Sequence, residues 1–248
     1  MRRVAIITGA SRGIGRATAL LAAREGYDVC INYKEDAAAA ETVAGECKSL
    51  GVRSTAYRAD VARRDDVCAL FSHCDEVLGR VTLLVNNAGI IGQASRLEDL
   101  TEAALDETFA VNLFGSVYCA QHAIARMSAS KGGPGGVIIN LSSIAAATGS
   151  PNEYVHYAAS KAAIEALTIG LSKEVGPDNI RVNAVRAGTT DTEIHARSGN
   201  PGRPAMVAQT APLRRVATPE DIAQAVMWLA SDQAGFASGA ILSISGGL

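Results

Sequence analysis

The sequence has few aromatic residues and no excess of charge of either sign. Phe, Trp and Tyr make up 4% of the 248 residues, and the formal net charge at pH 7 is −2. Because nucleic-acid-binding proteins usually carry a basic stripe, this balance gives no electrostatic reason to expect a nucleic-acid partner. Hydrophobic residues nevertheless make up 48% of the chain. Such a chain buries enough apolar surface to offset the entropy of ordering, which excludes an intrinsically disordered protein.

Long uncharged apolar runs are also missing. A membrane-spanning helix needs about 18 consecutive apolar residues, and no stretch approaches that length. The N-terminal segment Met1–Gly9 has two Arg and only four apolar residues before a turn, which is too short for the apolar region of a signal peptide. We therefore expect a cytoplasmic protein with no membrane partner.

Cysteine is scarce and odd in number. The five Cys residues are expected to stay reduced in that compartment. Cys68, His73 and Cys74 resemble metal ligands at first sight, but they lie in a predicted helix, and two adjacent residues cannot project from one helix face. We therefore expect no metal site, and interpret these cysteines as buried or half-buried.

Short apolar runs alternate with helical stretches along the whole chain. The two longest helices are predicted at 101–127 and 153–175, and strands are predicted at 4–8, 29–33, 53–58, 83–86, 137–141, 181–185 and 240–244. Strands separated by helices of this length indicate parallel βαβ units with helices on both faces of the sheet. We predict an α/β fold with a doubly wound parallel sheet of about seven strands, in a single domain spanning 1–248.

Glycine, in contrast, is frequent, and a glycine-rich loop follows the first strand. The segment Thr8–Gly15 reads Thr-Gly-Ala-Ser-Arg-Gly-Ile-Gly and opens the first helix. Glycines at such a turn let a pyrophosphate approach the backbone N–H groups of the helix N-terminus. The spacing Gly-x₃-Gly-x-Gly differs from the more familiar Gly-x-Gly-x₂-Gly of Rossmann-type folds, so the loop alone is weak evidence for dinucleotide binding.

The same loop also matches the Gly-x-Ser-x-Gly nucleophile elbow of α/β-hydrolases, in which Ser11 would be the nucleophile. That alternative places the elbow on the first strand, gives no role to Gly15 and lacks a His-Gly-Gly oxyanion segment. The dinucleotide interpretation is therefore favoured over the serine hydrolase.

The end of the second strand bears on which dinucleotide binds. An acidic residue there would hydrogen-bond the ribose 2′-hydroxyl of NAD, but this chain has Asn32-Tyr33-Lys34. Arg12 and Lys34 can together neutralise a 2′-phosphate, which favours NADP(H) over NAD(H). Asp60 and Val61, after the third strand, are candidates to hold the adenine, and an ordinary helix cap is the alternative for Asp60.

Tyr157 and Lys161 lie four residues apart in a predicted helix and so project from one face. An ammonium near a phenol lowers the phenol pKa from its usual value of about 10, as a general acid/base requires. Ser142 and Ser143 end the preceding strand, where a hydroxyl can hydrogen-bond a carbonyl oxygen that gains charge. A solvated helix pair and a serine that merely leaves a strand are the alternatives.

Together these residues resemble the short-chain dehydrogenase/reductase family over essentially the whole chain. The motifs that carry the resemblance are Thr8-Gly9-x₃-Gly13-Ile14-Gly15, Asn86-Asn87-Ala88-Gly89, Asn112, Ser143 and Tyr157-x₃-Lys161. The chain is most similar to bacterial members such as 3-oxoacyl-carrier-protein reductases and glucose-dehydrogenase-like enzymes. The resemblance implies an NADP(H)-dependent oxidoreductase that interconverts a ketone and a secondary alcohol, as a homotetramer that packs through the two long helices.

The resemblance also assigns roles. Tyr157 would exchange the substrate proton, Lys161 would bind the nicotinamide ribose and lower the Tyr157 pKa, Ser143 would hold the carbonyl, and Asn112 would anchor a water. The residues expected to bind the cofactor are Gly9, Ser11, Arg12, Gly13, Ile14, Gly15, Tyr33, Lys34, Asp60, Val61, Asn87, Ala88, Gly89, Tyr157, Lys161, Gly188 and Thr192. A non-catalytic NADP-binding protein that kept the fold is the alternative.

One position departs from the family pattern. Ala187 stands where the family usually has Pro before Gly188, and because Pro fixes φ, we expect a looser segment and weaker cofactor binding or a more mobile lid. Residues 188–217 are expected to form an irregular substrate loop. Four residues are candidates to face the substrate, with packing or solvent exposure as the alternative: Tyr154, His156, Ile194 and His195.

Overall fold

The computed structural model describes residues 3–248; Met1 and Arg2, part of the N-terminal segment considered above, lie outside the described residues. Seven parallel strands form one twisted sheet in the order β3-β2-β1-β4-β5-β6-β7, which confirms the predicted fold class. The strands are β1 Val4–Ile7, β2 Asp28–Tyr33, β3 Ser54–Arg58, β4 Leu83–Asn86, β5 Gly136–Ser143, β6 Ile180–Ala187 and β7 Ile241–Ile244.

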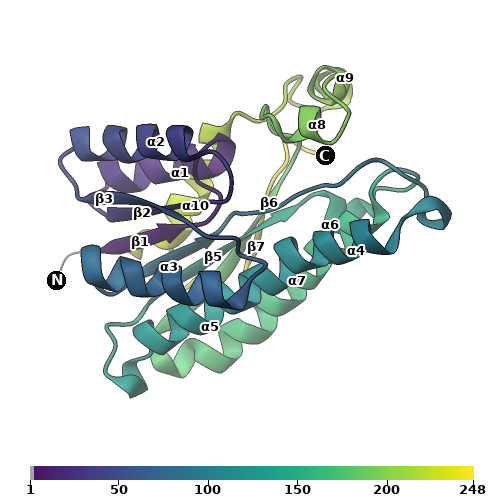
Figure 1. Cartoon of the computed structure of the whole chain (residues 1–248). Helices are drawn as coiled ribbons and strands as arrows, with labels where there is room; N and C mark the ends of the chain where they lie inside the picture. The colour runs from purple at the N-terminus through teal and green to yellow at the C-terminus, as the bar shows by residue number, and fades with distance from the viewer. Residues whose placement is uncertain (1–2) are drawn as a thin grey trace.

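Helices cover both faces of the sheet, as Figure 1 shows. One face carries α1 Gly13–Arg24, α2 Ala37–Ser49 and α10 Pro219–Ala230, and the other carries α3 Arg64–Val77, α5 Gly115–Met127 and α7 Val155–Val175. Each face has its own apolar core against the β-strands, because strands covered on both sides bury side chains on both faces of the sheet. Short 3₁₀ helices lie in the connections between these elements: η1 Leu97–Asp99, η3 Ala129–Lys131, η4 Gly176–Asp178 and η5 Asp232–Ala234.

The helix predicted at 101–127 is not a regular α-helix throughout. It consists of α4 Glu102–Phe109, a π-helical turn η2 Ala110–Phe114 and α5. Asn112 lies in this wider turn and is fully buried. π turns inside helices are frequent at functional sites, and periodicity alone did not distinguish this one from α-helix.

From β1 the chain adds β2 and β3 toward one edge of the sheet, and it then returns to add β4, β5, β6 and β7 toward the other. The strand order therefore reverses between β1 and β4. Open α/β sheets bind ligands outside the carboxyl ends of the strands at such a switch point. The glycine-rich loop follows β1 there, Asn87 follows β4, Ser143 ends β5 in register with Ala187, and Gly188 follows β6. Residues distant in sequence therefore meet at one edge.

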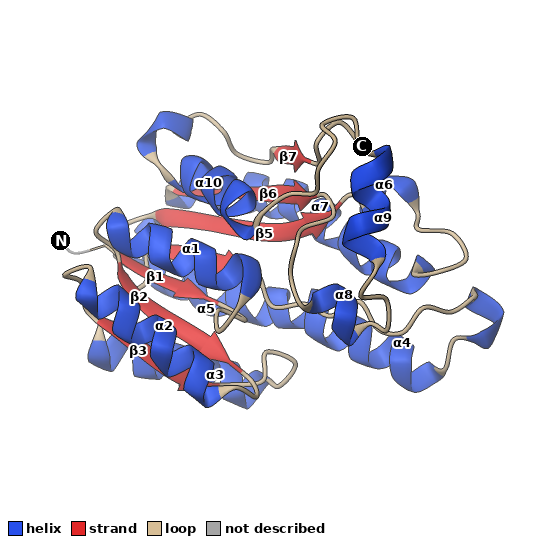
Figure 2. Cartoon of the chain, turned by 90° about the horizontal axis from the view of Figure 1, so that it is seen from above, coloured by secondary structure: helices blue, strands red, loops and turns tan. Residues whose placement is uncertain are grey.

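The segment 188–217 was expected to be irregular, but it contains two short helices. α8 Ile194–Arg197 and α9 Arg203–Thr210 lie over the carboxyl edge of the sheet (Figures 1 and 2), and the short helix α6 Ala145–Thr148 follows β5 and contacts α7. We call residues 188–217 the lid segment. Within the described residues, no helix combines the length and the apolar character needed to cross a membrane.

α10 begins with a capping box. The Thr218 hydroxyl accepts a hydrogen bond from the Asp221 amide at 3.2 Å, and the Asp221 carboxylate accepts one from the Thr218 amide at 2.8 Å. Arg215 also contacts Asp221, and the pKa of Asp221 falls to about 2, chiefly because of the hydrogen bond from Arg215. The cap joins the lid segment to a helix that packs closely on α1.

Candidate active site

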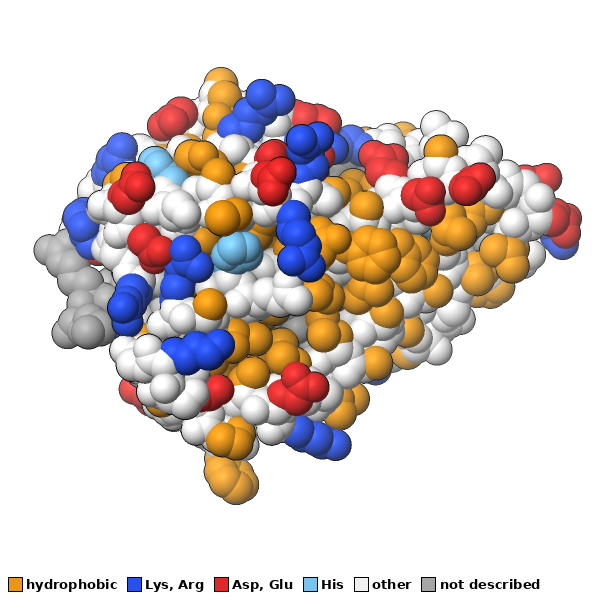
Figure 3. All heavy atoms as spheres, turned by 60° about the horizontal axis from the view of Figure 1, so that its bottom comes forward, with side chains coloured by type: hydrophobic (Ala, Val, Ile, Leu, Met, Phe, Trp, Pro, Cys, Tyr) orange, Lys and Arg blue, Asp and Glu red, His pale blue; other side chains and the backbone are white. Residues whose placement is uncertain are grey.

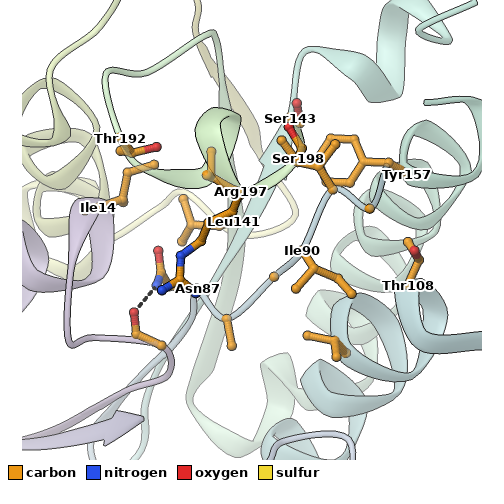
Figure 4. A pocket seen from close by; sticks show the side chains of 18 of the residues that line it. Ile14, Asn87, Ile90, Thr108, Leu141, Ser143, Tyr157, Thr192, Arg197 and Ser198 are labelled. Carbon is orange, nitrogen blue, oxygen red and sulfur yellow. Dashed lines mark hydrogen bonds between the residues drawn. The ribbon is translucent and has the colours of Figure 1, made fainter. Parts of the chain in front are cut away.

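A cavity of about 760 Å³ opens between the carboxyl edge of the sheet and the lid segment. Its walls come from the glycine-rich loop, the ends of β2 to β6, α4, the start of α7 and both lid helices. Figure 4 shows the side chains converging on it, with Ser143, Ser198 and Tyr157 at one end and Ile14 and Thr192 at the other. The volume lies in the range of small-molecule and cofactor sites.

Geometry explains the glycines of the loop. Gly9 and Gly13 have φ of +62° and +52°, which L side chains rarely adopt. A Cβ at Gly15 would lie 2.5 Å from both Asn87 Nδ2 and the Gly9 carbonyl oxygen. Asn87 Nδ2 donates to the Thr8 and Gly9 carbonyls at 2.8 and 3.1 Å. Gly15 is therefore needed because the Asn87 side chain and the Gly9 carbonyl, which tie the loop to the end of β4, leave no room for a Cβ.

Arg12 and Lys34 both line the cavity at the end beside β2, and each pairs with carboxylates. Lys34 Nζ lies 2.9 Å from Asp60, and the pKa of Lys34 is raised, mainly by that hydrogen bond. Arg12 contacts Asp36 at 3.4 Å and Glu193 at 3.0 Å. The two cations thus lie where the sequence predicted them, in a network of acids that the sequence did not indicate.

Arg197 is a residue that sequence reasoning missed. Figure 4 shows it reaching from the lid segment toward Asn87 and Leu141. Its guanidinium lies 3.6 Å from Glu35 and 3.9 Å from Glu193. Nothing in the sequence distinguishes it from a solvated arginine, because only the tertiary position of α8 brings it over the cavity.

Tyr157 and Lys161 lie one turn apart on α7, with Lys161 Nζ 5.8 Å from the Tyr157 ring centroid. Lys161 is buried, its ammonium donates to the Leu141 carbonyl at 2.7 Å, and burial lowers its pKa to about 8. Burial raises the pKa of Tyr157, while a hydrogen bond with Ser143 and the charge of Arg203 lower it. Burial outweighs these two effects, so the pKa of Tyr157 lies above its usual value, and the lowering expected from Lys161 is not found in this structure.

The two serines at the end of β5 point in different directions, as the pleat of a strand requires. Ser143 meets Tyr157 at the cavity, whereas Ser142 donates to Glu165 at 2.8 Å and to the Lys161 carbonyl at 3.3 Å. The structure therefore selects Ser143 as the hydroxyl beside the acid/base candidate, and gives Ser142 a role in packing α7 against β5.

Asn112 links three parts of the site. Its Oδ1 accepts from the Ile90 amide at 2.9 Å, and its Nδ2 donates to the Ile90 carbonyl at 2.9 Å and to Ser160 Oγ at 3.0 Å. A Cβ at Gly89 would lie 3.3 Å from Asn112 Oδ1 and 3.4 Å from Lys161 Nζ. Since both amide N–H groups are used, Asn112 positions the 89–90 segment against α7.

Most of the other residues predicted to contact cofactor or substrate line the cavity. The predicted cofactor residues that do so are Ser11, Tyr33, Asp60, Val61, Ala88, Gly89, Gly188 and Thr192, and the predicted substrate residues are Tyr154, Ile194 and His195. His156 is not among the cavity-lining residues; its ring packs against Gly92, where a Cβ would lie 2.9 Å from Nε2. Arg203 and Ser198, which do line the cavity, were not predicted.

Ala187, which stands at the usual Pro position, lies within β6 in register with Ser143 and Ile244, and its carbonyl accepts from the Ile144 amide at 2.8 Å. Weaker cofactor binding or a more mobile lid stays a prediction for this position. Ser11 has no histidine partner among the residues 3–248. The histidine that hydrogen-bonds to a hydroxyl side chain, His73, pairs with Thr55 at 3.0 Å, away from the cavity. The geometry gives no support to the serine hydrolase.

Comparisons with known proteins agree with this geometry. A family model described as enoyl-(acyl carrier protein) reductase matches residues 9–248. An uncharacterized oxidoreductase of Escherichia coli is 43% identical over 98% of this chain and 99% of its own length. A 3-oxoacyl-[acyl-carrier-protein] reductase of Staphylococcus aureus is 38% identical over 100% of this chain and 98% of its own.

A solved structure shows the same fold. A blue fluorescent protein from a metagenomic library, crystallised with NADPH, superposes with a TM-score of 0.90 at 32% identity and covers 99% of this chain and 97% of its own. The matches extend over nearly the whole length of both partners, and the motifs from the glycine-rich loop to Lys161 surround one cavity. The chain belongs to the short-chain dehydrogenase/reductase family of oxidoreductases.

Proposed function

We propose that the chain is an NADP(H)-dependent oxidoreductase that interconverts a ketone and a secondary alcohol. The observation that carries the proposal is that the Ser143 and Tyr157 side chains lie together at one end of the cavity (Figure 4), one helical turn from the buried ammonium of Lys161. A hydroxyl pair of this kind can hold a carbonyl oxygen and deliver a proton to it. The proposal treats the chain as one dinucleotide-binding domain with the lid segment over its substrate.

The nicotinamide cofactor supplies the hydride that the carbonyl carbon accepts. Ser143 Oγ donates a hydrogen bond to the carbonyl oxygen and orients it toward Tyr157. The Tyr157 hydroxyl gives its proton to that oxygen as negative charge develops, and the charge of Arg203 favours the phenolate that remains. Asn112 keeps the 89–90 segment and α7 in place, so that this geometry is formed before substrate arrives.

The cradle around Gly9 and Gly15 would hold the cofactor diphosphate, and Arg12, Lys34 and Arg197 would face its phosphates. The preference for NADP(H) over NAD(H) rests on Arg12 and Lys34 at the end of β2. It is supported by the similar structure that was crystallised with NADPH. The carboxylates that now pair with these cations would have to yield part of their contact to a 2′-phosphate.

The experiment that tests the acid/base assignment compares Tyr157→Phe with the parent for NADPH consumption over ketones, acetoacetyl thioesters, sugars and quinones. We expect kcat to fall at least about 100-fold, the usual contribution of a positioned general acid, with the NADPH Kd unchanged. Tyr118→Phe, outside the cavity, is the matched control and should behave as the parent. Retention of the parent kcat by Tyr157→Phe contradicts the proposal, and NADPH binding without turnover of any substrate supports a non-catalytic binding protein.

We further propose a cytoplasmic homotetramer that packs through the α4–α5 and α7 helices. Phe114, 48% exposed at the end of the π turn, and Ile169, 42% exposed on α7, lie on these helices. Figure 3 shows apolar side chains gathered on the face of the molecule below the sheet. The five cysteines are all free thiols, as a reducing compartment requires. Light scattering of the purified protein would give the tetramer mass or refute it.

A further inference from the structure

The two ends of the cavity differ in charge. The carboxylates that line it all belong to the end beside β2, where they face cations: Asp60 pairs with Lys34, Glu193 with Arg12 and Glu35 with Arg197, and Glu107 raises the pKa of Lys34. The end beside Tyr157 is lined by Arg203, and no carboxylate of the described residues lines it. An anion bound there would meet a cation and no competing acid in the wall.

The Arg203 side chain is held in place by contacts that occupy only part of its hydrogen-bond donors. It begins α9, its Cζ lies 5.5 Å from the Tyr154 ring centroid, and its Nη1 donates to Glu153 at 2.6 Å. Glu153 lies outside the cavity wall and its side chain is 37% exposed, against 21% for Arg203. Within residues 3–248, the Nε and Nη2 groups of Arg203 make no hydrogen bond. The ion pair therefore orients the guanidinium and leaves two donors for another partner.

A second observation points to a ligand at the same place. Tyr154 lines the cavity next to Arg203 and is 3% exposed, and its hydroxyl has no hydrogen-bond partner among the described residues. Buried hydroxyls are nearly always paired, so this one is available to a polar group of a molecule bound in the cavity. His195 also lines this end of the cavity and is 8% exposed. Burial and the charge of Arg203 lower its pKa, which disfavours a second positive charge beside Arg203.

We infer, on the basis of the function proposed above, that the substrate carries a carboxylate at a distance from its reacting carbonyl, and that Arg203 and the Tyr154 hydroxyl bind it. A planar guanidinium with two free donors matches a carboxylate in shape and charge. Stacking on the Tyr154 ring keeps that plane fixed. The substrates are thus oxo acids, and the products of their reduction are hydroxy acids. Arg203 is a specificity-determining residue of the lid segment.

The test uses matched pairs of probes: acetoacetate, 4-oxopentanoate and 5-oxohexanoate, each against its methyl ester, with NADPH consumption as the readout. For at least one chain length, kcat/KM should be about 10- to 100-fold higher for the acid, the range of a charge-assisted hydrogen bond. Arg203→Gln should abolish that preference, so that acid and ester are reduced with the same kcat/KM whatever change the loss of its charge near Tyr157 makes to both, and Tyr154→Phe should reduce the preference. Arg214→Gln removes an exposed charge of the lid segment outside the cavity and should change neither probe.

Glu153→Gln separates this role from a purely structural one. Freed from its partner, Arg203 should bind the acid more tightly, so the acid preference should rise, whereas Arg203→Gln lowers it. If the Arg203–Glu153 pair merely latches the lid, both variants lower kcat/KM for acid and ester alike, which overturns the inference. Equal kcat/KM for acid and ester in the parent overturns it as well.

A binding measurement keeps this inference distinct from the proposed function. Calorimetry of the same three oxo acids on the protein saturated with NADP⁺ does not depend on turnover. Binding that weakens at least about tenfold in Arg203→Gln supports the carboxylate site even if no ketone is reduced, which would refute only the ketone–alcohol chemistry. Turnover of neutral ketones without any binding of the oxo acids refutes the carboxylate site alone.

Discussion

Replacing Gly15 with Ala should destabilise the protein and weaken cofactor binding, although alanine is the better helix former. A Cβ there would lie 2.5 Å from Asn87 Nδ2 and the Gly9 carbonyl oxygen and 2.8 Å from Ala10 Cα. Two of these atoms are backbone, and the Asn87 amide is fixed by its two hydrogen bonds, so the loop must move by about half an ångström or more. Overpacking of this kind costs about 1–3 kcal/mol.

The opposing gain is smaller. Alanine in a helix interior is favoured over glycine by about 0.5–1 kcal/mol, and any weakening of the Asn87 hydrogen bonds adds about 0.5–1.5 kcal/mol each to the loss. We therefore expect a net destabilisation of roughly 2 kcal/mol, or a Tm lower by roughly 4–8 °C for a chain of this size. The NADPH Kd should rise, because the displaced carbonyl and amides form the cradle.

Gly45→Ala is the matched control. Gly45 is exposed on α2, and a Cβ there would meet nothing within 4 Å, so the same substitution should stabilise the protein by about 0.5–1 kcal/mol. Thermal unfolding followed by circular dichroism and NADPH titration by fluorescence give both quantities. The reasoning is refuted if Gly15→Ala unfolds at or above the parent Tm with an unchanged NADPH Kd.

Three other predictions concern different parts of the molecule. Burial lowers the Lys161 pKa to about 8, so between pH 8 and about 10.5 the unfolded chain binds more protons than the folded one. This lysine therefore makes the free energy of unfolding rise with pH over that range, by roughly 3 kcal/mol. In urea titrations at several pH values, Lys161→Met should show a smaller rise of that free energy with pH, and an unchanged rise contradicts the low pKa of Lys161. Lys34→Ala should raise the NADPH Kd about tenfold and leave the NADH Kd within about twofold; equal changes in both would mean that Lys34 does not contact a 2′-phosphate. Thr218→Ala removes the side-chain half of the capping box on α10 and should lower stability by about 1 kcal/mol, measured as a Tm shift of roughly 2–4 °C; a Tm equal to that of the parent excludes a stabilising cap.

Local features of the chain were predictable from sequence. The strand 83–86 was placed at its observed bounds, because an apolar run between a turn and a polar segment carries its own signal. The spacing of Tyr157 and Lys161 indicated a shared helix face for the same reason, since the helical period depends only on neighbours. The π turn at Asn112 was missed, because apolar periodicity does not distinguish it from α-helix and the residues that Asn112 contacts there, Ile90 and Ser160, are distant in the chain.

By itself the sequence determined the sheet, its alternation with helices, the glycine-rich loop and the shared helix face of Tyr157 and Lys161, all of which follow from short-range spacing and apolar periodicity. Only the tertiary structure decided why Gly15 must be glycine, since Asn87 reaches it from the end of another strand. It also decided which of Ser142 and Ser143 lies beside Tyr157, and brought Arg197 and Arg203 over the cavity. These outcomes depend on contacts between segments far apart in the chain, where no local pattern records which side chain will meet which.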